Sequence, residues 1–260
     1  MGKAADATFI QSRILNRGKG PAVHSLRVQS DRVKYHTYMK HTLENTPNLY
    51  IKQAEVTAVD VENGRVTAVR TKLGAIHPVK AAIITTGTYL NGKIHIGELN
   101  YSSGPDNLLP SSGLTGCLKD LGVSMRRFKT GTPARVHKRS IDFSVMEKQS
   151  GDEQIMPFAF DNEQELHNIV DCYVTYTNAE THKVILENLH RSPLYSGRIE
   201  GIGPRYCPSI EDKIVRFKDK ERHQLFVEPM GLDTDEYYLQ GMSSSPVSYT
   251  HLTLPTTSRV

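Results

Sequence analysis

The chain has 260 residues, of which 38% are hydrophobic and 23% are charged, and its formal net charge is +4. This length allows one large domain or two smaller ones with a substantial core. No run approaches the roughly 18 apolar residues of a membrane span, and the first residues lack the apolar core of a secretory signal. Three widely spaced cysteines form neither a CxxC pair nor a zinc-type cluster with histidines. We therefore predict a globular protein of a reducing cytoplasm, with no membrane span and no metal.

The first clear helix signal covers residues 31–45, where apolar and aromatic side chains recur at helical spacing. Two strand-like runs, 56–59 and 66–69, then flank Glu62-Asn63-Gly64, and Asn-Gly is a strong hairpin signal because both residues tolerate positive φ. Residues 81–88 form an apolar run that ends in Thr-Gly-Thr. This run predicts a buried strand of a parallel sheet, beyond whose carboxyl end a ligand would lie.

A short helix is expected over residues 112–121, followed by an extended basic segment. Between residues 126 and 139 six bases and no acid occur: Arg126, Arg127, Lys129, Arg135, Lys138 and Arg139. Such a cluster can neutralise phosphates of a nucleic acid or of a dinucleotide. It can equally be a solvated basic loop, and the residues alone leave both interpretations open.

The second half alternates strand and helix signals. Residues 171–176 and 224–229 read as strands. Thr177, followed by Glu180 three positions later, predicts a capping box for a helix that carries Val184, Ile185 and Leu189. His36 and His41 come near zinc-type spacing, but no cysteine pair accompanies them, so we expect solvated helix positions.

The most informative segment is GPRYCPSIEDKIVRF, at residues 203–217. Ser209 is a good N-cap residue, and Asp212 follows it in a pattern like a capping box. Cys207 thus precedes a helix start and has Arg205 two residues away, and both features favour a thiolate over a thiol. Burial beside the proline turn would favour the neutral thiol instead, so a reactive and a structural cysteine both stay possible.

This segment resembles the signature of the glucose-inhibited division protein A family. The resemblance extends from about residue 2 to residue 245 and includes FIQSRILN (9–16), KGPAV (19–23), GKIHIG (92–97), KTGTP (129–133) and HRSP (190–193). It implies an α/β fold, namely a partial FAD-binding Rossmann domain of the glutathione-reductase type with a smaller inserted α/β domain. It also implies that the chain is an internal fragment of a longer protein.

The resemblance implies a tRNA uridine 5-carboxymethylaminomethyl modification enzyme of the cytoplasm. Such an enzyme would use FAD, NAD(H) and a folate one-carbon donor, and would act with a tRNA-modification GTPase on the wobble uridine of tRNA. A homodimer would be expected for the full-length protein. The alternatives are a folate- and FAD-dependent tRNA uridine C5 methyltransferase and a non-catalytic tRNA- or dinucleotide-binding module.

The family's functional positions can be carried over where the motifs match. Cys207 would be a nucleophile or a general acid/base, or else would serve to place the nicotinamide-binding loop. Val56 and Ser111 align with FAD-contacting positions, and Lys129, Arg135 and Arg139 are candidate phosphate contacts for tRNA. The proposed NAD segment comprises Gly203, Pro204, Arg205, Tyr206, Cys207, Pro208, Ser209, Ile210, Glu211, Asp212, Lys213, Ile214, Val215, Arg216 and Phe217.

The expected organisation has a partial FAD-binding domain at 1–133, an insertion or NAD-binding domain at 134–241 and a tail at 242–260. No G-x-G-x-x-G loop occurs in the sequence. If the fold is the family's, the first strand, the glycine loop and the first helix would precede Met1, and the chain alone would bind FAD poorly. The last 15 residues, 246–260, contain no acid and show no periodicity, so we expect them to be foreign to the fold.

Overall fold

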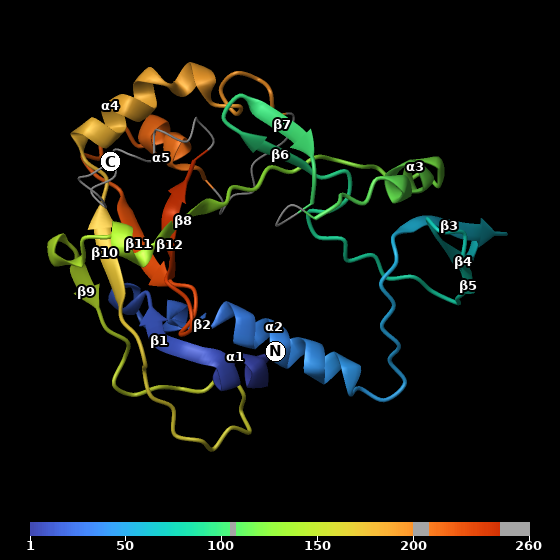
Figure 1. Ribbon diagram of the computed structural model, residues 1–260, viewed down its shortest axis with the longest axis horizontal. Coiled ribbons are helices and arrows are strands. Elements are labelled where there is room, and N and C mark those ends of the chain that lie inside the picture. Colours follow the sequence, from blue (N-terminus) through green and yellow to red (C-terminus); the bar gives the residue numbers. More distant parts are fainter. Residues whose placement is uncertain (105–107, 200–207, 245–260) are drawn as a thin grey trace.

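The computed structural model describes residues 1–104, 108–199 and 208–244. Its strands form four separate sheets, with strand orders β1-β2, β8-β12-β11-β10-β9, β3-β4-β5 and β6-β7. Figure 1 shows the five-stranded sheet beside α4 and α5, with β1, β2 and α2 below it and the β3-β4-β5 sheet at the far end of the molecule. Of the tail expected at 242–260, Met242 and Ser243 belong to the strand Glu236–Ser243, whereas residues 245–260 lie outside the described residues.

The five-stranded sheet is antiparallel throughout. It consists of β8 (Pro133–His137), β12 (Glu236–Ser243), β11 (Gln224–Pro229), β10 (Cys172–Tyr176) and β9 (Glu147–Gln149). The strands predicted at 171–176 and 224–229 are confirmed as β10 and β11. β11 and β12 are joined by a short connection, which antiparallel neighbours allow, whereas the chain between β10 and β11 carries α4 and α5 and still returns antiparallel.

The main core lies between this sheet and the helices α4 (Ala179–Glu187) and α5 (Ile210–Arg216). Leu225 and Val227 are two residues apart on β11 and therefore point to the same face. On β12 the inward residues are Leu239 and Met242, three apart. Gly241 between them has φ 97°, a conformation that glycine adopts without strain, and the register with β8 shifts there.

Residues 1–44 pack beneath this sheet. They form α1 (Gly2–Thr8), β1 (Phe9–Leu15), two short 3₁₀ turns (Arg17–Lys19 and Pro21–Val23), β2 (Ser25–Ser30) and α2 (Arg32–Glu44). The helix predicted at 31–45 is confirmed as α2, capped by Asp31, whose carboxylate accepts from Val33 N and Lys34 N. The amide of Gln11 donates to the carbonyl oxygens of Gln149 and Val170, which ties β1 to the strands above it.

The predicted hairpin is confirmed. It forms β3 (Val56–Glu62) and β4 (Arg65–Thr71), and β5 (Ile76–Pro78) adds to β4. Asn63 and Gly64 at its turn have φ values of 50° and 75°, as a tight hairpin with a right-handed twist requires. The helix α3 (Gly113–Asp120), predicted at 112–121, packs on β3 and buries Leu114 and Leu118 against Val59.

The remaining short elements are β6 (Lys93–Ile96) and β7 (Leu99–Ser102), and the 3₁₀ turns Lys138–Ser140, Phe143–Val145 and Leu189–Arg191. Among the described residues, no helix is both long enough and apolar enough to cross a membrane.

Two sequence predictions were wrong. Residues 81–88 are not a buried strand: none of them belongs to a strand, and Ile83 is 90% exposed. A parallel strand needs neighbours on both sides and helices on both faces, and none of the described strands pairs with this run. The cap of α4 is also displaced by one residue, because Asn178, not Thr177, accepts the backbone N–H of Thr181 in the capping box.

Candidate functional site

The predicted NAD segment is described only over residues 208–217. Gly203, Pro204, Arg205, Tyr206 and Cys207, the predicted catalytic residue, lie outside the described residues. The helix start is where the sequence placed it: Ser209 is the N-cap of α5, and its hydroxyl accepts the backbone N–H of Asp212 at 3.4 Å. Ile210 and Ile214 bury against the five-stranded sheet, so hydrophobic packing fixes one face of this short helix.

The polar residues of α5 contact three other parts of the chain. Asp212 lies 3.8 Å from the ammonium of Lys129 and accepts a hydrogen bond from the hydroxyl of Tyr195 at 3.3 Å. Lys213 donates to the carbonyl oxygen of Gly241 on β12 at 3.3 Å. Burial lowers the pKa of Lys213, and burial together with Asp212 raises the pKa of Tyr195.

The three candidate phosphate contacts occupy different environments. Lys129 has a side chain only 5% exposed and faces Asp212, a placement that does not favour contact with a phosphate on the surface. Arg135 is exposed and lies 3.3 Å from Glu236. Arg139 is exposed on the 3₁₀ turn that follows β8, so Arg135 and Arg139 remain accessible to a polyanion.

The two predicted FAD contacts are brought into one region. Val56 begins β3, and Ser111 precedes α3, the helix that packs on β3. Glu55 joins them, because its carboxylate accepts the backbone N–H of Ser112 at 3.3 Å. A Cβ on Gly113 would come within 2.8 Å of the Thr57 side chain, so the close approach of α3 to β3 needs glycine at this position.

This region and α5 lie well apart in Figure 1, where the β3-β4-β5 sheet and α3 are on the right and α5 is at the upper left. The positions predicted for FAD and for the nicotinamide nucleotide are therefore not brought together by the described residues. For FAD the predicted contacts would cover one side only, because no G-x-G-x-x-G loop that would hold the pyrophosphate occurs in these residues and the run 81–88 is mostly exposed. The chain by itself does not fit the whole cofactor, so no catalytic step through a flavin is derived.

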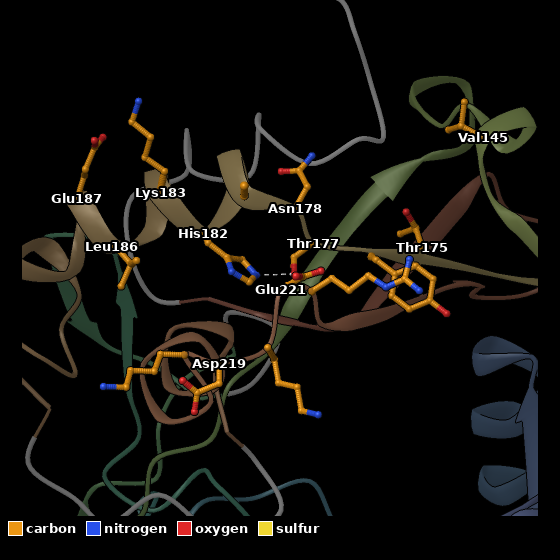
Figure 2. A pocket seen from close by; sticks show the side chains of 15 residues that line it. Val145, Thr175, Thr177, Asn178, His182, Lys183, Leu186, Glu187, Asp219 and Glu221 are labelled. Atoms are coloured by element: carbon orange, nitrogen blue, oxygen red, sulfur yellow. Dashed lines mark hydrogen bonds between the residues drawn. The ribbon is translucent and has the colours of Figure 1, made fainter.

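The structure also has an open pocket that the sequence did not predict, with a volume of about 1060 Å³. Figure 2 shows residues from the end of β10, the first turns of α4 and the turn before β11 around it, with a hydrogen bond between Thr177 and His182. Thr177 Oγ1 lies 2.8 Å from His182 Nε2 and accepts the backbone N–H of His223 at the same distance. Burial lowers the pKa of both histidines, which favours their neutral forms.

The charges around this pocket nearly balance, because bases and acids alternate along residues 218–222. His182, which lines the pocket, and His223 lie far apart in the sequence, so no local motif could have predicted that their rings lie 5.5 Å apart. Within the part of the chain that the structure describes, no three His, Cys, Asp or Glu side chains come together as a metal site would require. The exposed positions predicted for His36 and His41 are confirmed.

The fold defines a mixed α/β protein that contains part of a Rossmann-type domain and an antiparallel five-stranded sheet. Residues 1–250 match the glucose inhibited division protein A family, and the chain belongs to that family. The fold class and family inferred from the sequence are thus confirmed.

The chain is 62% identical over 245 residues to the tRNA uridine 5-carboxymethylaminomethyl modification enzyme MnmG of Caldicellulosiruptor saccharolyticus, and 59% identical over the same length to the enzyme of that name from Clostridium botulinum. Each alignment covers 94% of this chain and 39% of the relative. The structure of Aquifex aeolicus GidA superposes with a TM-score of 0.89 at 49% identity, and covers 96% of this chain and 43% of that one. The chain thus spans about two fifths of its relatives' length.

Proposed function

We propose that this chain is part of an enzyme that modifies C5 of the wobble uridine of tRNA with a carboxymethylaminomethyl group. The observation that carries the proposal is the 62% identity to an enzyme of that name, which extends over 94% of this chain. In this proposal FAD and NADH are the redox cofactors, a folate supplies the one-carbon unit, and a GTPase and a second copy of the full-length protein are partners in the cytoplasm.

Cys207 is proposed as the reactive group. Carbon C5 of uracil is a poor nucleophile, and addition of a thiolate to C6 moves the electrons of the C5=C6 bond onto the C4 carbonyl as an enolate. The enolate can then attack an electrophilic one-carbon unit through C5. Loss of the C5 proton and departure of the thiolate restore the ring, so the cysteine is regenerated. General acid/base work by the same thiol is the alternative role.

The other positions follow from the same proposal. Val56 and Ser111 would contact FAD, residues 203–217 would bind the nicotinamide nucleotide, and Arg135 and Arg139 would contact tRNA phosphates. Support for the flavin positions comes from the shared region that Glu55 holds together. Support for the two arginines comes from their exposure and from the absence of acids between residues 126 and 139.

A chimera tests the proposal. The matched segment of the Caldicellulosiruptor enzyme is replaced by residues 1–244 of this chain, and the chimera is expressed in bacteria that lack their own enzyme. We expect mass spectrometry of tRNA nucleosides to recover the carboxymethylaminomethyl group, and Cys207→Ala to reduce it at least 100-fold. A folded chimera without the modified nucleoside contradicts the proposal. Methylated uridine would favour the methyltransferase, and tRNA binding without either product would favour a binding module.

A further inference from the structure

Lys129 was expected to reach a phosphate, yet its side chain lies inside the protein. Its ammonium is 3.8 Å from Asp212, and the two side chains are 5% and 13% exposed. Two opposite charges that are largely withdrawn from water interact strongly, and the removal of one partner leaves the other buried and uncompensated. The pair therefore links the segment before β8 to the first turn of α5.

Tyr195 completes this arrangement from another part of the chain. Its hydroxyl donates to Asp212 Oδ1 at 3.3 Å. Asp212 thus holds contacts from two separate earlier parts of the chain, one at residue 129 and one at residue 195. We call Lys129, Tyr195 and Asp212 the Asp212 cluster.

The next residue of α5 is attached to a third element. Lys213 donates to the carbonyl oxygen of Gly241 on β12. A Cβ on Gly241 would lie 3.5 Å from the Lys213 ammonium, and Gly241 has positive φ. The irregular backbone of β12 therefore lies at Gly241, the residue whose carbonyl oxygen accepts the hydrogen bond from α5. With Ile210 and Ile214 in the core, α5 is held by polar contacts on consecutive residues and by packing on its inner face.

We infer that Lys129 is a positioning residue, which acts through the Asp212 cluster to fix the orientation of α5 and so of residues 208–217, and that it is not a contact to tRNA phosphate. The inference rests on the proposed function, because residues 208–217 belong to the proposed nicotinamide segment. A helix that is already held in one orientation does not lose conformational entropy when its ligand binds. Release of the cluster should therefore weaken NADH binding and leave the chemistry that follows largely unchanged.

The test uses the chimera with Lys129→Met, Lys129→Arg, Asp212→Asn, Tyr195→Phe and the double variant Lys129→Met/Asp212→Asn. Lys119→Met, at an exposed lysine in the last turn of α3, is the matched control. Hydrogen exchange of the peptide that contains α5 is measured, together with KM and kcat for NADH oxidation and the salt dependence of tRNA binding.

We expect Lys129→Met to speed exchange in α5 about 10-fold and to raise the KM for NADH about 10-fold with kcat within about 2-fold, because broken ordering affects binding first. Lys129→Arg should recover most of both effects. The double variant should be no worse than the worse single variant, since both remove the same pair. Tyr195→Phe removes the hydrogen bond to Asp212 but leaves the pairing of Asp212 with Lys129 in place, so it should shift the exchange rate and the KM in the same direction by a smaller factor. This variant keeps the inference testable if Lys129→Met does not fold.

Unchanged exchange in α5 overturns the inference. Faster exchange with an unchanged KM for NADH also overturns it, because Lys129 would then be structural only. A tRNA affinity whose salt slope falls by about one phosphate contact, with NADH binding intact, would return Lys129 to the phosphate role. A chimera that never oxidises NADH contradicts the proposed function itself, whereas NADH oxidation with unaltered α5 exchange contradicts only the positioning role.

Discussion

At the scale of the residue, Asp31 joins two parts of the protein through one carboxylate. It caps α2 by accepting from Val33 N and Lys34 N at 3.0 Å, and it also accepts the backbone N–H of Leu232, which follows β11. Gly231 approaches so closely that a Cβ there would lie 2.9 Å from the carboxylate. Burial by itself would raise the pKa of Asp31, but the hydrogen bonds from Lys34, Leu232 and Val33, with the charge of Lys34, lower it overall.

We predict that Asp31→Ala lowers the free energy of unfolding by about 2 kcal/mol, because it removes an N-cap and a tertiary hydrogen bond. A lowered folded-state pKa means that this stability is present above the unfolded value and is lost as the pH falls through the folded value. Urea unfolding at neutral and acidic pH should show the penalty shrinking in acid. Asp233→Asn, at a side chain that is 85% exposed, is the control. An equal penalty at both pH values would contradict the role of the charge.

At Glu228, in contrast to Asp31, the effect of burial on the pKa outweighs the effect of the favourable contacts. Its carboxylate contacts the guanidinium of Arg27 and is nearly inaccessible. Burial raises the pKa of Glu228, and the attraction and hydrogen bond of Arg27 offset this only in part. The nearby Cys172 is fully buried, and burial followed by the Glu228 charge raises the pKa of its thiol to about 12. Cys172 is therefore an inert core residue.

We predict that Glu228 favours folding most at low pH. A raised folded-state pKa makes the folded protein bind more protons than the unfolded chain between the two values, so its contribution is complete below the unfolded pKa and declines as the pH rises through the folded pKa. The difference in unfolding free energy between wild type and Glu228→Gln should fall from about pH 4 to about pH 7. Glu236→Gln on β12, at a side chain that is 40% exposed, is the control. A difference that grows with pH would mean that the ion pair with Arg27 dominates.

At the scale of the element, two glycines have different backbone conformations, so the same substitution should have opposite effects on stability. Gly64 has φ 75° in the turn between β3 and β4. Gly116 lies inside α3, has no positive φ and has open space where a Cβ would stand. Gly64→Ala should cost about 1 kcal/mol of stability because alanine is strained at positive φ. Gly116→Ala should add about 0.5–1 kcal/mol because alanine restricts the unfolded chain and favours helix.

Thermal unfolding of the two variants checks this pair of predictions. Both variants introduce the same methyl group. Stability changes of opposite sign would therefore be due to the different backbone conformations at the two positions. A stabilising Gly64→Ala would show that the turn does not hold the conformation described.

Local signals predicted the elements that need only local physics. The Asn-Gly turn, the Ser209 cap and α2 follow from side chains that satisfy or bend the neighbouring backbone. Thr177 failed as a cap because its hydroxyl is engaged by His182 and by the backbone of His223. The strand predicted at residues 81–88 was wrong because burial of a parallel strand depends on neighbouring strands, which the local sequence does not reveal. The burial of Lys129 could not be predicted for the same reason, because its partner Asp212 lies far along the chain.

At the scale of the whole molecule, hydrogen bonds cross the domain boundary expected at residue 133. Ser12 N donates to Asn168, Ile14 N donates to Asp152, and Gln29 donates to Pro229 O. Residues 1–44 are therefore joined to the five-stranded domain, and β3, β4 and α3 pack around a separate small core. The domain boundary at residue 133 stays a prediction. Residues that precede it in the sequence pack against residues that follow it.

The proposed flavin contacts, Val56 and Ser111, lie in or beside this smaller unit, and the proposal that they form only part of the FAD site has a measurable consequence. We predict that the purified chain binds FAD at least about 1,000-fold more weakly than the chimera, because the glycine loop that would hold the pyrophosphate is absent from the sequence. In the chimera, Val56→Asp should reduce retained flavin by about 10-fold or more. Val66→Asp on β4 perturbs the same hydrophobic cluster and is the matched control for stability. Flavin absorbance after gel filtration measures both. Stoichiometric flavin on the chain alone would contradict the first expectation, and equal losses in the two variants would contradict the contact at Val56, since a shared loss reports only damage to the cluster.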